Sequence, residues 1–207
     1  MGRLGHRSKH YGRHRRIRLG DHAGGAVNQP TVPMNIHEYA ALMGQILVNL
    51  QALEFALRTR LSYDDPPYRQ LPAGKRLQEL KAGDRVPENS FTGYETLGRP
   101  IEHYNGQVAN SDPDLTVDPD IVTLRDALAH GRASSLPDDA DADTVLLKFS
   151  RPENGQVTVT FSECLTREWL NIRVRRVFLE VRKVFHAMDR ARVRLRNQRE
   201  AKDKASE

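Results

Sequence analysis

The sequence predicts a mainly α-helical domain with one β-hairpin inserted before a long C-terminal helix. Apolar residues recur every three or four positions over two long segments, 36–61 and about 167–190, which is the period of a helix with one buried face. Between them, β-rich runs at 144–149 and 156–161 flank Asn154-Gly155, a dipeptide typical of a two-residue hairpin turn. The 207 residues suffice for one domain with charged ends.

The first long helix is expected directly after Pro33. Asn35 can cap it, and Glu38 completes a capping box by reaching back to the Asn35 amide. Its predicted buried stripe comprises Ile36, Tyr39, Met43, Ile46, Leu50, Leu53, Leu57 and Leu61. We expect this helix to be the central helix of the fold and to end before Asp64.

The next part of the chain is rich in proline and glycine. Residues 62–93 predict a long loop, functional or disordered, with one short helical patch at 75–81. A second helix is expected over about 95–104, softened at Gly98 and Pro100 and stopped by Asn105-Gly106.

A third, short helix is expected over about 119–130. Asp118 caps it, and Pro119 takes the first helical position, where a missing N–H costs nothing. Gly131 is expected to end it in the left-handed conformation. The predicted buried stripe is Ile121, Leu124 and Leu128.

The last helix is expected to begin at the cap residue Thr166. Its buried stripe is Leu170, Val174, Val177, Val181, Val184 and Met188. Past residue 190 the stripe gives way to charge, so residues 191–207 are predicted to be a charged, frayed tail. Residues 1–33, rich in Arg, His and Gly, are predicted to be a basic disordered arm, and residues 34–190 the folded domain.

Charge is unevenly distributed along the chain. The formal net charge is +5, from 32 Lys and Arg against 27 Asp and Glu. Residues 1–20 and 167–207 each carry +7, whereas residues 21–166 carry −9. Both ends can therefore attract polyanions such as nucleic acid, although solvated charged tails have the same composition.

Cysteine content and hydropathy exclude several classes of protein. A single cysteine rules out a disulfide framework and argues against a structural zinc site, so we expect no metal and no cofactor. No uninterrupted apolar run approaches the ~18 residues of a membrane span. We expect a cytoplasmic protein without a membrane partner.

The short helix at 119–130 carries the candidate catalytic residues Arg125, Asp126 and His130. Residues four apart share a helix face, so the Asp126 carboxylate is expected beside the His130 ring, holding one ring nitrogen. Arg125 lies about 140° around the axis from His130. Two copies of this helix across a two-fold axis would place two Arg and two His in one cleft, which would suit the binding of a phosphate. An Asp-His pair followed by glycine is also an ordinary helix end.

The string Arg-Asp-Ala-Leu-Ala-His-Gly, at the end of a short Pro-capped helix that follows a long amphipathic one, resembles the HEPN superfamily. Arg125, Asp126 and His130 match its Arg, polar residue and His, and Ala129 and Gly131 match the residues that flank its histidine. The resemblance implies a bundle of about four helices that forms a homodimer. It also implies metal-independent RNA cleavage, often by a toxin or in defence against phage. In that scheme His130 is the acid or base and Arg125 stabilises the phosphate.

Further residues outside the motif are candidates for the site. Glu54 lies on the apolar stripe of the first helix and could assist the site, or pair with Arg58 four residues on. An RNA-binding edge, or a solvated basic face, could comprise Arg132, Arg173, Arg176 and Lys183.

The sequence thus predicts a homodimeric, metal-independent endoribonuclease that acts on RNA, with an antitoxin or regulatory protein as a further partner. The alternative is a non-catalytic module of the same fold that binds RNA or a protein.

Overall fold

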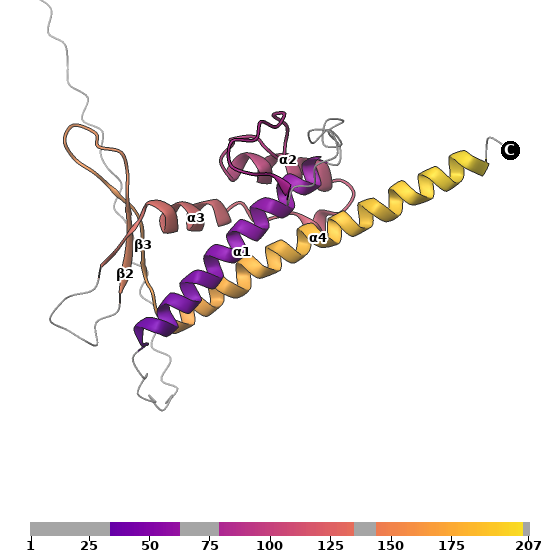
Figure 1. Cartoon of the computed structure of the whole chain (residues 1–207). Coiled ribbons are helices and arrows are strands. Elements are labelled where there is room, and N and C mark those ends of the chain that lie inside the picture. The colour runs from indigo at the N-terminus through magenta and orange to yellow at the C-terminus, as the bar shows by residue number, and fades with distance from the viewer. Residues whose placement is uncertain (1–33, 63–78, 135–143, 205–207) are drawn as a thin grey trace, which may run out of the picture. The chain divides into compact units, whose positions relative to one another are not determined.

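The computed structural model describes residues 34–62, 79–134 and 144–204. The chain divides into the units Met1–Val32 and Pro33–Glu207, and all the described residues belong to the second. The predicted arm therefore lies outside the described residues, as does most of the helical patch at 75–81. The elements follow in the order α1 (Ile36–Ser62), α2 (Gly98–Val108), the 3-10 helix η4 (Pro113–Leu115), α3 (Ile121–His130), β1 (Arg132–Ser134), β2 (Val145–Phe149), β3 (Val159–Cys164) and α4 (Arg167–Lys204) (Figure 1). The predicted mainly helical class is confirmed.

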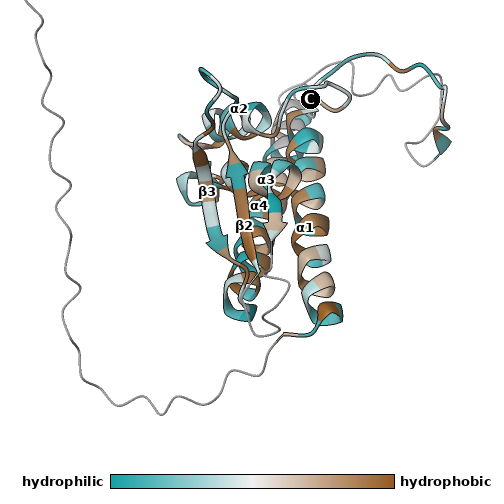
Figure 2. Cartoon of the chain, turned by 90° about the vertical axis from the view of Figure 1, so that its left-hand side faces the viewer, coloured by the Kyte–Doolittle hydropathy of each residue, from teal (hydrophilic) through white to brown (hydrophobic). Residues whose placement is uncertain are grey.

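Helices α1 and α4 form the centre of the unit and run side by side in the same direction (Figure 1). Arg167 binds Glu38 where both helices begin, and the Asn49 Nδ2 donates to the Val174 carbonyl at 3.3 Å further along. The predicted stripes are largely buried, although Tyr39, Met43 and Val174 are only partly covered and Ile36 is 70% exposed. Figure 2 shows the hydrophobic colour along much of α1 and on β2.

The start of α1 is held by a modified version of the predicted capping box. Asn35 caps the helix, since its Oδ1 accepts the backbone N–H of Glu38 at 2.9 Å. The second half of the prediction is wrong, because the Glu38 carboxylate accepts hydrogen bonds from the Arg167 guanidinium, one of them 2.7 Å long. A charged donor outcompetes a backbone amide, and this pair lowers the pKa of Glu38.

Helix α2 is shifted toward the C-terminus from its prediction. It begins at Gly98 and continues through Asn105-Gly106. Pro100 does not break it, because in the first turn its missing N–H would have no helical partner. Asn105 does not stop it, because its side chain bonds both backbone groups of Val117, at 2.7 and 2.8 Å.

Helix α3 confirms the predicted short helix but not the role of its final glycine. The Asp118 carboxylate accepts the N–H of Asp120 at 2.9 Å, and the helix proper begins at Ile121. Gly131 has φ −76° and ψ 170°, which is extended and not left-handed. A Cβ at this position would lie 2.2 Å from the Ala127 carbonyl oxygen and 2.8 Å from the Leu146 Cδ1. Gly131 is therefore needed for a close approach where α3 turns directly into β1.

The inserted hairpin is part of a three-stranded antiparallel sheet with the order β1-β2-β3. The turn at Asn154-Gly155 is confirmed, with φ of 52° and 77°, but β3 begins at Val159, later than predicted. Strand β1 was not predicted, because it has three residues and no apolar alternation. Leu146 on β2 and Leu165 pack against Ala127 of α3.

Helix α4 begins as predicted, with the Thr166 Oγ1 accepting the Trp169 N–H at 3.1 Å. It continues to Lys204, so residues 191–204 of the predicted charged tail are helical. Buried Asp112 accepts hydrogen bonds from Arg190 at 2.6 Å and Arg194 at 3.0 Å. These pairs support the helix where its apolar stripe ends.

Helix α1 is the one helix in the described ranges that is long and apolar enough to cross a membrane, judged by length and composition alone. The central helix of a soluble fold meets the same criteria, and α1 places Ile46, Leu50, Leu53 and Leu57 in the core. The expectation of a cytoplasmic protein without a membrane partner stays a prediction.

Candidate functional site

The candidate catalytic residues lie on α3 outside the buried stripe of the helix. Ile121, Leu124 and Ala127 are buried, and this packing fixes the orientation of the helix. The side chains of Arg125 and Asp126 are each 37% exposed, and His130 is exposed in the last turn. The structure thus keeps the three residues accessible to a ligand.

The partners of Asp126 differ from the prediction. Its Oδ1 accepts a hydrogen bond from the Arg125 Nη1 at 3.3 Å, and its Oδ2 lies 3.6 Å from the Lys148 Nζ. The expected Asp126-His130 pair is not formed. The two cations instead attract the carboxylate electrostatically.

Lys148 is a site residue that was not predicted from the sequence. It lies on β2 two residues after buried Leu146, so both side chains point to the face of the sheet that packs on α3. A single lysine in an otherwise apolar strand could have indicated a site residue at this position. Only the structure shows that α3 covers this strand.

His130 forms no hydrogen bond or ion pair with any residue in the described ranges. Its ring nitrogens are therefore open to solvent or to a ligand. Arg125 uses one guanidinium nitrogen in the hydrogen bond to Asp126, which leaves further N–H donors for another acceptor. One carboxylate offsets one of the two neighbouring cations, so Arg125, Asp126 and Lys148 together keep a net positive charge that can attract an anion.

Glu54 does not join this group of residues. Its Oε1 accepts two hydrogen bonds from Arg58, at 2.9 and 3.0 Å, which confirms the alternative i, i+4 pair. Arg58 also donates to the carbonyls of Gly93 and Glu95, at 2.8 and 2.7 Å. The pair attaches the segment before α2 to α1, which is a structural role.

The four basic residues predicted to bind RNA do not form one free edge. The guanidinium of Arg132 lies over the Phe149 ring at 5.6 Å, and that of Arg173 over the Trp169 ring at 5.0 Å.

The other two of these residues are engaged by acids and backbone. Arg176 binds Asp118, and Lys183 binds Glu180 at 2.9 Å and the Thr116 carbonyl at 3.1 Å. Although partial burial opposes the effect, hydrogen bonds from the Asp120 amide and Arg176 lower the pKa of Asp118. Arg176 and Lys183 hold α4 against the segment before α3, so little of their charge is left for RNA.

No group of three or more His, Cys, Asp or Glu side chains that could hold a metal ion occurs within the described segments.

No protein-family model matches the sequence, and neither a curated protein nor a solved structure shows significant similarity to it. A functional assignment therefore depends on the chemistry of the residues around His130.

Proposed function

We propose that this chain is a metal-independent endoribonuclease of the HEPN type, with its catalytic residues at the C-terminal end of α3. The observation that carries the proposal is that His130 is exposed and has no partner among the described residues. On the same helix, Asp126 contacts two cations, Arg125 and Lys148. An imidazole exchanges protons near neutral pH, and guanidinium and ammonium groups bind phosphate. RNA supplies a phosphate next to a hydroxyl group, which is the substrate that this combination suits.

The proposed reaction is an internal transfer of the phosphate. The ribose 2′-oxygen bonds to the adjacent phosphorus, and the bond from phosphorus to the 5′-oxygen breaks. His130 takes the proton of the 2′-hydroxyl or gives one to the leaving 5′-oxygen, and Arg125 stabilises the negative charge on the phosphate. The products are a 2′,3′-cyclic phosphate and a 5′-hydroxyl. Asp126 holds Arg125 and Lys148 in place and does not orient the histidine.

The resemblance supplies the biological context of the proposal. One histidine serves one of the two proton transfers, and a homodimer in which two α3 ends meet in a composite cleft supplies a second. A toxin or phage-defence role, controlled by an antitoxin or regulatory protein, belongs to the same proposal.

A second candidate is a non-catalytic module that binds RNA or a protein. It is favoured by the Asp126 contacts, because Arg125, Asp126 and Lys148 together tie α3 to β2. In this case the three residues stabilise the fold and His130 has no catalytic role.

An RNA-cleavage assay in excess EDTA separates the two candidates. We expect the wild type to cut RNA, and His130→Ala and Arg125→Ala each to reduce the rate at least about 100-fold, as loss of acid-base or charge stabilisation does. His103→Ala is the matched control, since His103 is also an exposed histidine on a short helix, α2. Its rate should equal that of the wild type.

Unfolding curves of all four proteins show whether a lost activity reflects lost structure. RNA binding without cleavage by the folded wild type would contradict the nuclease and support the module.

A further inference from the structure

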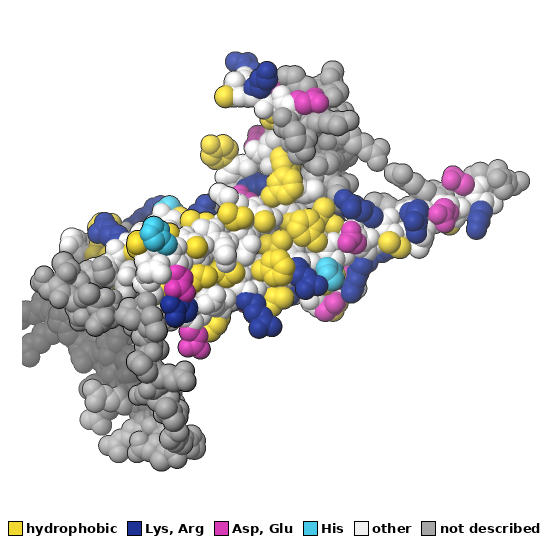
Figure 3. All heavy atoms as spheres, turned by 60° about the horizontal axis from the view of Figure 1, so that its bottom comes forward, with side chains coloured by type: hydrophobic (Ala, Val, Ile, Leu, Met, Phe, Trp, Pro, Cys, Tyr) yellow, Lys and Arg dark blue, Asp and Glu magenta, His cyan; other side chains and the backbone are white. Residues whose placement is uncertain are grey.

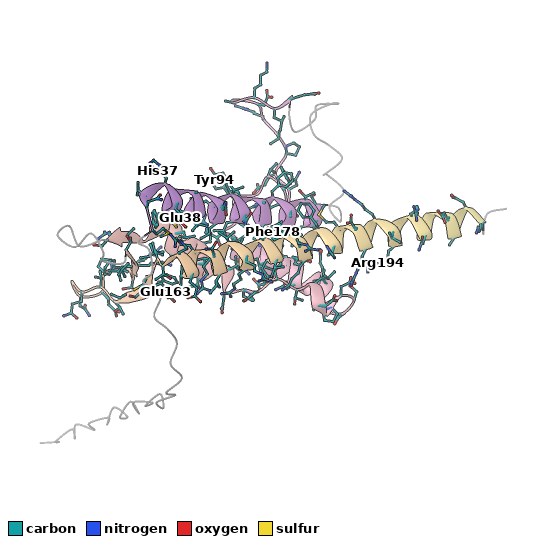
Figure 4. The ribbon with its side chains drawn as sticks, turned by 90° about the horizontal axis from the view of Figure 1, so that it is seen from below. His37, Glu38, Tyr94, Glu163, Phe178 and Arg194 are labelled. Carbon is teal, nitrogen blue, oxygen red and sulfur yellow. The ribbon has the colours of Figure 1, made fainter. Side chains whose placement is uncertain are left out.

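The outer surface of α1, where it runs beside α4, carries no charge. Between Glu38 and Glu54 the sequence has no Lys, Arg, Asp or Glu. Val48 on this surface is 62% exposed and Phe55 51%, and Phe178 and Phe185 on α4 are 49% and 45% exposed. Figure 3 shows apolar side chains gathered in the middle of this side of the molecule, with charged ones at its margins, and Figure 4 shows Phe178 where α4 runs beside α1.

This surface is distinct from the core face of α1. The core takes Ile46, Leu50, Leu53 and Leu57, which lie on the opposite side of the helix. A helix that meets water on one side normally carries polar and charged residues there, and a helix that is apolar all round is normally buried. Depletion of charge with exposed aromatic residues is the composition of the centre of a protein interface.

Gly44 lies in this surface, in the interior of α1. A Cβ added there would meet nothing within 4 Å in the described part of the chain. No contact of this chain therefore explains a residue that weakens helices relative to alanine. Close approach of a second backbone does explain it.

The residues of this surface are arranged symmetrically in sequence about Val48. Gln45 and Gln51 lie three positions to either side, Gly44 and Ala52 lie four, and Ala41 and Phe55 lie seven. At 100° per residue, all of them fall within about 60° of Val48 around the helix axis. In an antiparallel pair related by a two-fold axis at Val48, each Phe55 meets the small residues Ala41 and Gly44 of the other copy, and Gln45 meets Gln51.

We propose that a second copy of this chain docks on the outer face of α1 and α4, with its α1 antiparallel to the first and the two-fold axis near Val48. The pairing is self-complementary in shape, since each bulky end faces a small end. An uncharged face suits a second uncharged face and does not suit a polyanion.

This proposal does not depend on the proposed function. Helix α3 contributes no residue to the face, so each copy keeps its own Arg125/His130 site. A composite cleft between two α3 ends requires a different contact.

Oppositely charged substitutions on the axis test both the occupant and the register. Sedimentation equilibrium of the full chain at about 100 μM should give the wild type twice the mass of Val48→Glu or of Val48→Lys. These two variants lose the α1 contact, because two like charges meet on the axis. Mixed in equal amounts, they should regain the wild-type mass. Leu47→Glu is the matched control, because Leu47 is apolar and 45% exposed but points about 100° away from Val48, and this variant should keep the wild-type mass.

Four outcomes of that experiment overturn the proposal: a monomeric wild type, Val48 variants that keep the wild-type mass, a mixture that keeps the lower mass of the variants, or a Leu47→Glu variant that dissociates like the Val48 variants. Circular dichroism of each variant confirms that it is folded.

Gly44→Ala gives a second test, because a glycine with no role in an interface would affect only the stability of the helix and not dimerisation. Alanine should raise the melting temperature of the Val48→Glu protein, in which the α1 contact is broken, by about 2–4 °C, because it favours the helix. In the wild-type background it should weaken dimerisation at least about tenfold, because the added methyl group holds the helices apart. A dimer that is unchanged or strengthened by Gly44→Ala contradicts the proposed close approach.

Discussion

At the residue scale, Gly131 shows how a single position joins two elements of the candidate site. It lies between His130, the last residue of α3, and Arg132, the first of β1. Its backbone conformation is open to any residue, so its importance is steric. Because it brings β2 against α3, it also places Lys148 next to Asp126.

We expect Gly131→Ala to destabilise the fold by about 2–4 kcal/mol, since its Cβ would overlap the Ala127 carbonyl. Urea unfolding measures this directly. Gly106→Ala is the matched control, because Gly106 lies inside α2 with nothing within 4 Å of an added Cβ. It should be neutral or stabilise by up to about 1 kcal/mol. Equal effects of the two substitutions would refute the steric explanation.

The same residues show what the sequence could predict about the site. Spacing alone placed Arg125, Asp126 and His130 on one short helix, and this is confirmed. It could not predict the partner of Asp126, because Lys148 is 22 positions away and approaches only through the packing of β2 on α3. For Gly131, local sequence preferences favoured a left-handed residue, whereas contacts with β2 determine its conformation.

At the element scale, the last part of α4 depends on ion pairs with the η4 region. Asp112 is buried and accepts hydrogen bonds from both Arg190 and Arg194. The hydrogen bond from Arg190, with that from Arg194, lowers the pKa of Asp112 although burial opposes it. The carboxylate is therefore more acidic in the folded state than in the unfolded chain, where the pKa is about 3.9.

The sign of the pH dependence follows from this direction. The stability contributed by ionised Asp112 is complete above the unfolded pKa and is lost as the pH falls through the lower folded pKa. We expect Asp112→Asn to cost about 2 kcal/mol at pH 6 and distinctly less at pH 3. Asp189→Asn, which removes a surface pair with Arg192, should cost little at either pH. A penalty for Asp112→Asn that is the same at both pH values would contradict the account.

The elements themselves were predictable to different degrees. Strongly periodic α1 and α4 were placed from apolar spacing, and the hairpin turn from Asn154-Gly155. The short strand β1 was missed, because it exists only through pairing with β2. The C-terminal extension of α4 was missed because Asp112 and Asp114, which bind Arg190, lie more than 70 positions earlier.

At the scale of the whole molecule, two exposed regions differ in chemistry. The end of α3 has a histidine, two cations and one acid, and it suits a small charged group such as a phosphodiester. The outer face of α1 is uncharged and lies beside the exposed aromatic residues Phe178 and Phe185 of α4, and we propose that it binds a second copy of the chain. The proposed catalysis and the proposed assembly therefore use separate surfaces and can be tested separately.

The central claim is that the end of α3 cleaves RNA by attack of the 2′-hydroxyl. The most direct measurement uses an oligoribonucleotide cut by the wild type in excess EDTA and a matched one with a single 2′-deoxynucleotide on the 5′ side of the cut. We expect the first to yield a 2′,3′-cyclic phosphate, the second not to be cut at that bond, and His130→Ala to cut neither. Cleavage of the deoxy-substituted bond, or undiminished cleavage by His130→Ala, would contradict the claim.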